Sequence, residues 1–153
     1  MAKCPIREIA KQAGDAGIPF LVIGGYAVFA HGYVRATDDL DLIVQRGRRA
    51  QLGKLLGDLG MTVKNDAANF VQFDPPDENG MDVDLMFVSE DVFGRLEQAA
   101  VKATVEGTQV RVVSLLHLIC SEVPRAATRQ ILAPTQRHGR SGATQPDQSA
   151  GLE

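Results

Sequence analysis

The feature that most constrains this fold is the stretch from Phe20 to Val44. It opens with a short apolar run, Phe20–Ile23, which is followed at once by the pair Gly24–Gly25. A run of that length, ended by glycines, predicts a buried strand that finishes in a tight turn. Residues 26–31 then predict a short helix, and residues 38–44 predict a second strand. The stretch therefore predicts a strand, a turn, a helix and a strand in that order.

The second predicted strand carries two carboxylates two positions apart. Asp39 and Asp41 alternate with Leu40 and Leu42, so both acids point to one face of the strand and both leucines to the other. Neighbouring like charges repel, and a divalent cation bound between them compensates for that repulsion. The alternative is a solvated strand edge whose acidic side chains merely discourage aggregation.

A later stretch, Met81–Val88, predicts another strand and carries Asp82 and Asp84. The two acids share a face, so alternation cannot choose between them. Asp84 lies deeper in the apolar run, where an uncompensated charge would cost more, and we select it as the third carboxylate. If this strand lies beside Asp39–Val44, the three carboxylates can bridge a pair of Mg²⁺ ions and clamp the attacking and leaving oxygens of a phosphoryl transfer.

Two features that precede these acids in the chain suit a phosphate. Gly24–Gly25 lets a ligand approach the backbone closely at the start of a helix, although a plain turn is the simpler reading. Arg35 can bind phosphates through its guanidinium, and a structural ion pair with a nearby aspartate is an equal alternative. His31 is expected to end the short helix rather than bind a ligand, and Thr37 is expected to bond locally where the second strand begins.

Composition narrows the class of protein. With 153 residues, of which 44% are hydrophobic, the chain is long enough for one globular domain with a proper core. Its net charge of −3 argues against a generally basic nucleic-acid binder. Cys4 and Cys120 are far apart and outside any metal-ligand spacing, which suits a reduced, cytoplasmic setting. No apolar run approaches the roughly 20 residues that span a membrane.

The remaining chain alternates between helical and extended patterns. Further helices are expected at residues 6–16, 48–59 and 91–100, and short strands at residues 61–63, 70–73 and 110–113. Ser114 is expected to cap a helix that runs from Leu115 to about Ser121. Together these elements predict an α+β fold, a mixed β-sheet flanked by helices, within residues 1–123. Residues 124–153 are rich in Arg, Gln, Ser, Gly and Pro, and predict a disordered or atypical C-terminal tail.

The order of these motifs resembles a known superfamily. Gly24-Gly25, Arg35-Ala-Thr37, Asp39-Leu-Asp41 and the later Asp84 are similar to the motifs of the nucleotidyltransferases that include DNA polymerase β. More narrowly, the chain resembles small bacterial nucleotidyltransferases related to the AbiEii-type toxins of toxin–antitoxin and phage-defence systems. The resemblance covers roughly residues 6–119.

This resemblance implies a reaction and assigns roles. Gly24 and Gly25 would hold the triphosphate of a nucleotide, with ATP as the default, while Asp39 and Asp41 would bind two Mg²⁺ ions. Asp84 would help activate an acceptor hydroxyl, as a ligand or as a general base. The hydroxyl would then attack the α-phosphate, and pyrophosphate would leave. The acceptor stays open between an RNA end such as that of tRNA, a protein hydroxyl and a small molecule.

The C-terminal part departs from the pattern. After Ser114–Ile119 the relatives continue with a lysine-bearing helix, whereas here Pro124 interrupts any continued helix. One hypothesis is that the natural C-terminus was replaced or lost, for instance through a frameshift. A second function therefore stands beside the enzyme: a non-catalytic or truncated member of a toxin–antitoxin pair that binds a partner protein through the same surface.

Overall fold

The computed structural model describes residues 2–34 and 36–119, and these form a mixed seven-stranded sheet with helices packed around it. The helices are α1 (Ile6–Ala16), α2 (Gly24–Ala30), α3 (Arg49–Asp58), α4 (Glu90–Ala99) and α5 (Leu115–Ile119). The strands are β1 (Phe20–Ile23), β2 (Asp39–Gln45), β3 (Thr62–Ala67), β4 (Phe70–Asp74), β5 (Asp82–Val88), β6 (Val101–Val105) and β7 (Thr108–Val112). The predicted α+β fold with a mixed sheet is confirmed.

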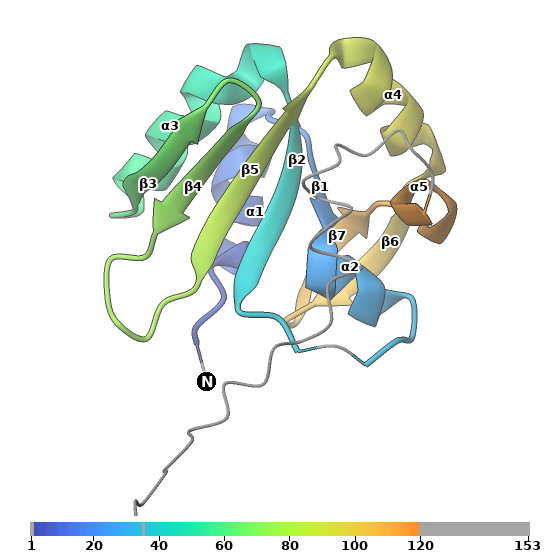
Figure 1. The fold of residues 1–153 in the computed structure, drawn as a ribbon, viewed down its shortest axis with the longest axis horizontal. Coiled ribbons are helices and arrows are strands. Elements are labelled where there is room, and N and C mark those ends of the chain that lie inside the picture. The colour runs from blue at the N-terminus through green and yellow to red at the C-terminus, as the bar shows by residue number, and fades with distance from the viewer. Residues whose placement is uncertain (1, 35, 120–153) are drawn as a thin grey trace, which may run out of the picture.

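The sheet topology brings distant parts of the chain together at its centre. The strand order is β3-β4-β5-β2-β1-β7-β6 (Figure 1). The central strand β2 runs antiparallel to β1 on one side and parallel to β5 on the other. The C-terminal end of β1 and the N-terminal ends of β2 and β5 therefore lie on the same side of the sheet. Helix α2 leaves the sheet at these strand ends (Figure 1).

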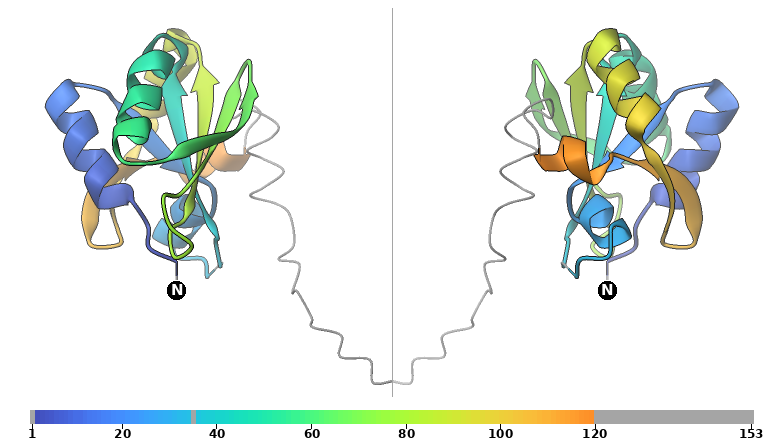
Figure 2. Two further views of the ribbon diagram at one scale, coloured as in Figure 1. Left: turned by 90° about the vertical axis from the view of Figure 1, so that its left-hand side faces the viewer. Right: turned by 90° about the vertical axis from the view of Figure 1, so that its right-hand side faces the viewer.

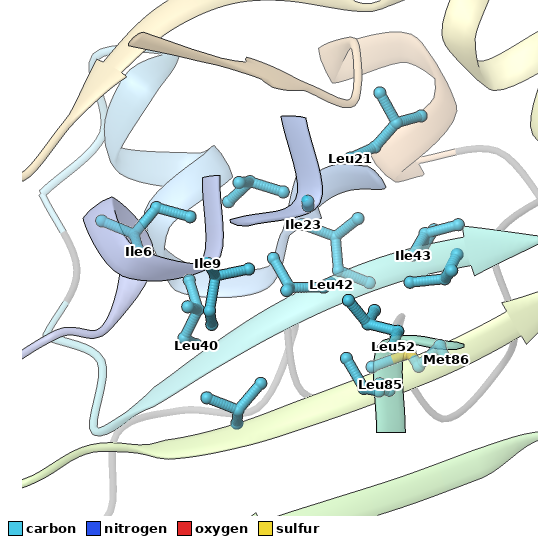
Figure 3. Packing of buried hydrophobic residues seen from close by; sticks show 14 of the residues in the cluster. Ile6, Ile9, Leu21, Ile23, Leu40, Leu42, Ile43, Leu52, Leu85 and Met86 are labelled. Carbon is cyan, nitrogen blue, oxygen red and sulfur yellow. The ribbon is translucent and has the colours of Figure 1, made fainter. Parts of the chain in front are cut away.

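Helices α1 and α3 cover one face of the sheet, and α5 lies on the opposite face (Figure 2). The core forms between the sheet and the α1–α3 layer, because alternate strand residues point that way. Leu40 of β2 lies beside Ile9 of α1, and Leu52 of α3 lies beside Leu85 of β5 (Figure 3). All four side chains are fully buried. The opposite residues of β2 and β5 therefore face away from this layer, toward the face that carries the polar groups.

One strand of the sheet was not predicted from the sequence. β6 pairs with β7 in an antiparallel hairpin, whereas only the second of these strands was expected. The connection is Glu106–Gly107, and both residues have positive φ, 47° and 74°. Two such residues make the tight turn that matches the twist of a hairpin. Glutamate is uncommon at such a position, which explains why the sequence pattern did not reveal the turn.

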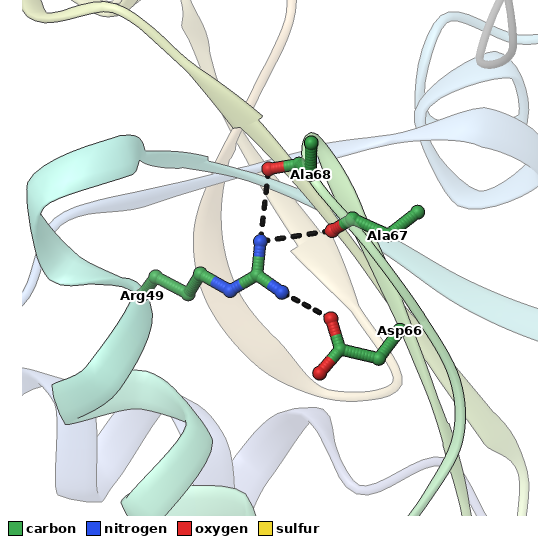
Figure 4. Close-up of polar contacts among 4 residues, drawn as sticks. All are labelled: Arg49, Asp66, Ala67 and Ala68. Atoms are coloured by element: carbon green, nitrogen blue, oxygen red, sulfur yellow. Dashed lines mark hydrogen bonds and ion pairs between the residues drawn. The ribbon is translucent and has the colours of Figure 1, made fainter.

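The edge strand β3 is longer than the sequence suggested and is irregular. Its pairing with β4 shifts register between Val63 and Asn65, so Lys64 is the extra residue of a β-bulge. Arg49, at the start of α3, fixes the far end of this hairpin: it donates hydrogen bonds to the carbonyls of Ala67 and Ala68 and pairs with Asp66 (Figure 4). The helix expected at residues 48–59 begins as a 3₁₀ turn, η1 (Arg46–Arg48), before α3.

Some expectations fall on residues that the structure does not describe. They concern Arg35, Cys120, the end of the last helix near Ser121, and the tail at residues 124–153. Within the described part, Ser114 caps α5, since its Oγ accepts a hydrogen bond from His117 N at 3.4 Å. No helix in that part is both long enough and apolar enough to cross a membrane.

Candidate active site

The parallel register of β2 and β5 places four carboxylates in two neighbouring cross-strand pairs, which we call rungs. Asp39 pairs with Asp82, and two residues further on Asp41 pairs with Asp84. Because both strands alternate in step, all four side chains point to the face of the sheet opposite α1 and α3. The structure therefore brings Asp84 beside Asp41, and it places Asp39 one rung away, nearer the start of the strands.

The Asp41–Asp84 pair, which we call the inner rung, is more buried than the Asp39–Asp82 pair, which we call the outer rung. Asp84 is 0% exposed and Asp41 is 4% exposed, and within residues 2–34 and 36–119 they are the buried members among the polar and charged residues. Asp39 is only half-buried. Burial raises the pKa of Asp39 above its ordinary value, and the neighbouring charges of Asp82 and Asp38 raise it further, while Lys64 lowers it. The inner rung is thus a pair of buried carboxyl groups on adjacent strands, whereas the outer rung is partly exposed.

Lys64 distinguishes the two acids of β5. Its Nζ lies 3.0 Å from Asp82 Oδ2 and 3.1 Å from Asp74 Oδ1. Asp82 is therefore paired with a lysine near the surface, whereas Asp84 lies deeper and next to Asp41. Of the two acids of β5, Asp84 is the buried one that lies beside Asp41.

Gly24 and Gly25 pack directly against this site. A Cβ at Gly24 would lie 2.0 Å from Asp41 Oδ2, and one at Gly25 would lie 2.5 Å from Thr37 Cβ. Gly24 also has a φ of 66°, a conformation that costs other residues about 1–2 kcal/mol. Glycine is therefore required twice over at position 24: for the turn, and for the close approach to the Asp41 carboxylate.

Two residues between the glycines and the acids have structural roles, as expected. His31 follows the last residue of α2, and its Nε2 donates a hydrogen bond of 2.8 Å to the carbonyl of Val113, after β7. Thr37 Oγ1 donates a hydrogen bond of 2.9 Å to the carbonyl of Asp39 and so fixes the start of β2. Both residues hold the loop that joins α2 to the carboxylate strand.

The sequence analysis missed a polar extension of the inner rung. Gln72 of β4 pairs with Asp84, and Asn65 of β3 pairs with Gln72. Asn65 Nδ2 donates a hydrogen bond of 2.7 Å to Gln72 Oε1. The alternation in Phe70-Val-Gln-Phe73 carries the signal for Gln72, because Val71 and Phe73 point to the core and Gln72 must point the other way.

A pocket of about 440 Å³ opens where the carboxylate strands begin. Its wall includes Tyr26, Thr37, Asp38 and Met81. Asp38 and Met81 directly precede the first carboxylates of β2 and β5. Burial raises the pKa of Tyr26 well above its usual range, so its hydroxyl stays protonated and lies 3.5 Å from Glu106 Oε1 as a donor. A pocket therefore lies next to the two rungs, at the N-terminal ends of β2 and β5.

The donor set of the inner rung suits Mg²⁺. Asp41 and Asp84 supply hard carboxylate oxygens from adjacent strands, with Asp39 at the next rung. Within the described residues no three His, Cys, Asp or Glu side chains converge as a ready-made metal cage. The structure thus brings two of the three predicted carboxylates together and leaves Asp39 one rung away. Mg²⁺ usually takes one or two protein carboxylates and completes its shell with water and substrate phosphates.

A glycine turn against paired carboxylates on a central mixed sheet is the arrangement that the resemblance to nucleotidyltransferases implies. The chain matches the family model described as aminoglycoside-2''-adenylyltransferase over residues 5–142. It belongs to the aminoglycoside-2''-adenylyltransferase family, and it is thus an enzyme of the nucleotidyltransferase type. No sequence among curated proteins matches the chain.

Solved structures of nucleotidyltransferases share the fold. The crystal structure of ANT(2'')-Ia in complex with adenylyl-2''-tobramycin is 22% identical, with a TM-score of 0.56, over 71% of this chain and 67% of that one. The lincomycin-bound lincosamide antibiotic adenylyltransferase LnuA is 11% identical, with a TM-score of 0.57, over 84% of this chain and 94% of that one. In a solution structure of ANT(2'')-Ia the match spans 63% of that chain, under two thirds of its length.

Proposed function

We propose that this enzyme transfers the AMP group of ATP to a hydroxyl of a small, amine-bearing acceptor of the aminoglycoside class. The observation that carries the proposal is the buried Asp41–Asp84 pair with Gly24 packed against Asp41. Two neighbouring carboxylates on the central strands supply the hard oxygen ligands that Mg²⁺ takes, and the glycine turn beside them brings the backbone close to the same place. The family match and the solved relatives support an antibiotic as the acceptor.

The proposed mechanism assigns each residue a task. Asp39, Asp41 and Asp84 would hold Mg²⁺, which when bound neutralises charge on the phosphates. Gly24 and Gly25 would let the β- and γ-phosphates lie close to the backbone beside Asp41. The Asp84 carboxylate accepts the proton of the acceptor hydroxyl, and the hydroxyl oxygen forms a bond to the α-phosphorus. The bond from that phosphorus to the bridging oxygen breaks, and pyrophosphate leaves with the electron pair. Arg35 stays a proposed phosphate ligand outside the described residues.

The narrower context predicted from the sequence receives less support. A role in a toxin–antitoxin or phage-defence system, with tRNA or a partner protein as the target, rested on the resemblance to AbiEii-type toxins. The family match and the antibiotic adenylyltransferases among the solved structures favour a small molecule instead. We therefore keep tRNA as a competing acceptor in the test and propose the small molecule.

The test is a transfer assay with α-³²P-ATP, Mg²⁺ and one of three acceptors: tobramycin, lincomycin or tRNA. We expect label on tobramycin, its loss on chelation of the metal, and its loss in Asp41→Asn. Asp58→Asn is the matched control, because Asp58 is an exposed carboxylate that pairs with Lys54 on α3. Label on tRNA alone would replace the acceptor class. No transfer to any acceptor, with tight capture of a protein partner, would establish the non-catalytic alternative.

A further inference from the structure

The inner carboxylate rung continues as a row of amides across the sheet. Asp41 of β2 pairs with Asp84 of β5, Asp84 with Gln72 of β4, and Gln72 with Asn65 of β3. The four side chains share the face opposite α1 and α3. We call Gln72 and Asn65 the amide row. It joins the buried carboxylates to the exposed edge of the sheet.

The bulge in β3 places Asn65 in this row. Val63 pairs with Phe73, a core residue, and therefore points toward α3. With regular alternation Asn65 would share the face of Val63. The extra residue Lys64 shifts the register, so Asn65 pairs with Gln72 and lies on the opposite face. Bulges are frequent next to active sites because they re-aim a side chain in this way.

The hydrogen bond within the amide row fixes which end of Gln72 is available. Asn65 Nδ2 donates to Gln72 Oε1 at 2.7 Å, so the oxygen of Gln72 is engaged and its NH₂ group is oriented as the donor. Gln72 is only partly exposed, which limits its rotamers, whereas Asn65 is exposed. The row thus offers a held N–H donor directly beside Asp84, the proposed base.

The in-line geometry of phosphoryl transfer places the acceptor on the side of the inner rung that carries the amide row. Phosphoryl transfer proceeds with the attacking and leaving oxygens roughly in line. The glycine turn follows β1, on one side of β2, while β5, β4 and β3 lie on the other side. If pyrophosphate leaves beside Gly24, the acceptor must approach from the side of Asp84 and the amide row.

We propose that the acceptor lies over the amide row, and that the Gln72 amide donates a hydrogen bond to an acceptor oxygen next to the reacting hydroxyl. This rests on the proposed function and names a further acceptor-binding residue for it. The occupant we infer is the polyhydroxylated acceptor of the proposed function, because the amide row presents hydrogen-bonding groups that suit its hydroxyls. Asn65 is a positioning residue that acts through Gln72.

The test compares the Michaelis constants of the two substrates. Gln72→Met keeps the length of the side chain but removes its donor, and we expect KM for tobramycin to rise about fivefold to tenfold, the worth of one hydrogen bond. KM for ATP should stay within about twofold. Asn65→Ala should give a smaller rise, and adding it to Gln72→Met should give no further rise, since both act through one bond. Gln109→Met is the matched control, because Gln109 lies exposed on β7, outside the amide row.

A second measurement needs no variant. Tobramycin added to the ¹⁵N-labelled wild-type chain should shift the side-chain NH₂ resonance of Gln72 and leave that of Gln109 in place. An unmoved Gln72 resonance, as expected if another part of the chain covers the row, would overturn the inference. So would an unchanged KM for tobramycin in Gln72→Met while Asp41→Asn abolishes transfer. Transfer that survives in Asp41→Asn would instead overturn the proposed function, whatever Gln72 does.

Discussion

Two charged clusters on the same half of the sheet are built in opposite ways. At the β3–β4 hairpin, Arg49 pairs with Asp66, donates to two carbonyls and lies 4.9 Å from the ring centre of Phe87. Opposite charges meet there near the surface, with side-chain exposures of 33% for Arg49 and 62% for Asp66. At the inner rung, Asp41 and Asp84 bring like charges together in a buried place.

The difference suggests separate roles for the two clusters, one in stability and one in catalysis. In the Arg49 cluster the guanidinium is hydrogen-bonded and ion-paired, and these contacts link α3 to the β3–β4 hairpin, so the cluster contributes to stability. The Asp41–Asp84 pair instead buries two carboxyl groups side by side on the central strands, beside the glycine turn. We therefore expect changes at the rung to affect catalysis most, and changes at Arg49 to affect stability most.

The largest effect is expected from Asp41→Asn. The amide keeps the size of the side chain and loses the charge that would bind Mg²⁺, so we expect kcat to fall about a thousandfold, or about 4 kcal/mol in the barrier. Steady-state kinetics with ATP and tobramycin checks this. A fall of less than tenfold would mean that the rung is structural and that the contrast with Arg49 is false.

Next is Gly24→Ala, which tests the close approach to Asp41. The new Cβ would lie 2.0 Å from Asp41 Oδ2 and would occupy a φ of 66°. We expect the free energy of unfolding to fall by about 2–4 kcal/mol and activity to fall with it. Urea unfolding measures this change.

Gly17→Ala is the matched control for that variant. Gly17 has a φ of 65°, and a Cβ there would meet nothing within 4 Å. Its loss should be about 1–2 kcal/mol, from the backbone alone, with activity intact. Equal losses in the two variants would show that the contact with Asp41 contributes nothing.

A moderate effect on stability alone is expected from Arg49→Met. The variant loses two hydrogen bonds to carbonyls and the contact with Phe87, for which we expect about 1–2 kcal/mol after allowance for solvent screening of the exposed ion pair. Turnover should stay within twofold. Lys54→Met, which breaks an exposed pair with Asp58, should cost under about 0.5 kcal/mol. A loss of turnover in Arg49→Met without a loss of stability would blur the division between the two clusters.

The smallest effect is a pH dependence at the outer rung. The pKa of Asp39 is raised in the folded chain, by burial first and then by the charges of Asp82 and Asp38. The folded state therefore binds its proton more tightly than the unfolded state, and stability falls as pH rises from the unfolded pKa, about 4, through the raised folded value. Asp39→Asn should flatten this fall in a series of urea titrations without Mg²⁺. An unchanged slope would contradict the raised pKa.

Much of the fold follows from local patterns. The alternation in Asp39-Leu-Asp-Leu42 and the apolar run through Val88 dictated two buried central strands, and the shared parity of Asp82 and Asp84 placed both on one face. The parallel register that makes Asp41 the partner of Asp84 is a long-range property, set by packing against α1 and α3, which no local pattern encodes. Asp84 was selected over Asp82 from its depth in the apolar run, whereas the pairing of Asp82 with Lys64, from a strand at the sheet edge, follows only from the structure.

Other features of the structure could not be predicted from the sequence, for physical reasons that the structure shows. The strand β6 was missed because its residues are mostly exposed and its turn uses glutamate where asparagine or glycine is usual. The amide row was missed because a bulge at Lys64 reverses the alternation, so Asn65 changes face without any change of residue type. Gly24 was expected to serve a phosphate, but its contact with the Asp41 side chain follows only from the three-dimensional arrangement.

The outermost strand, β3, has all six of its residues exposed. Substitutions there disturb little packing, whereas the neighbouring carboxylates sit in the interior and tolerate few replacements. With the acceptor placed over the amide row as we propose, side chains on this rim can change while the reactive centre stays intact. Acceptor preference would then be the property that single substitutions along β3 alter most readily, at little cost in stability.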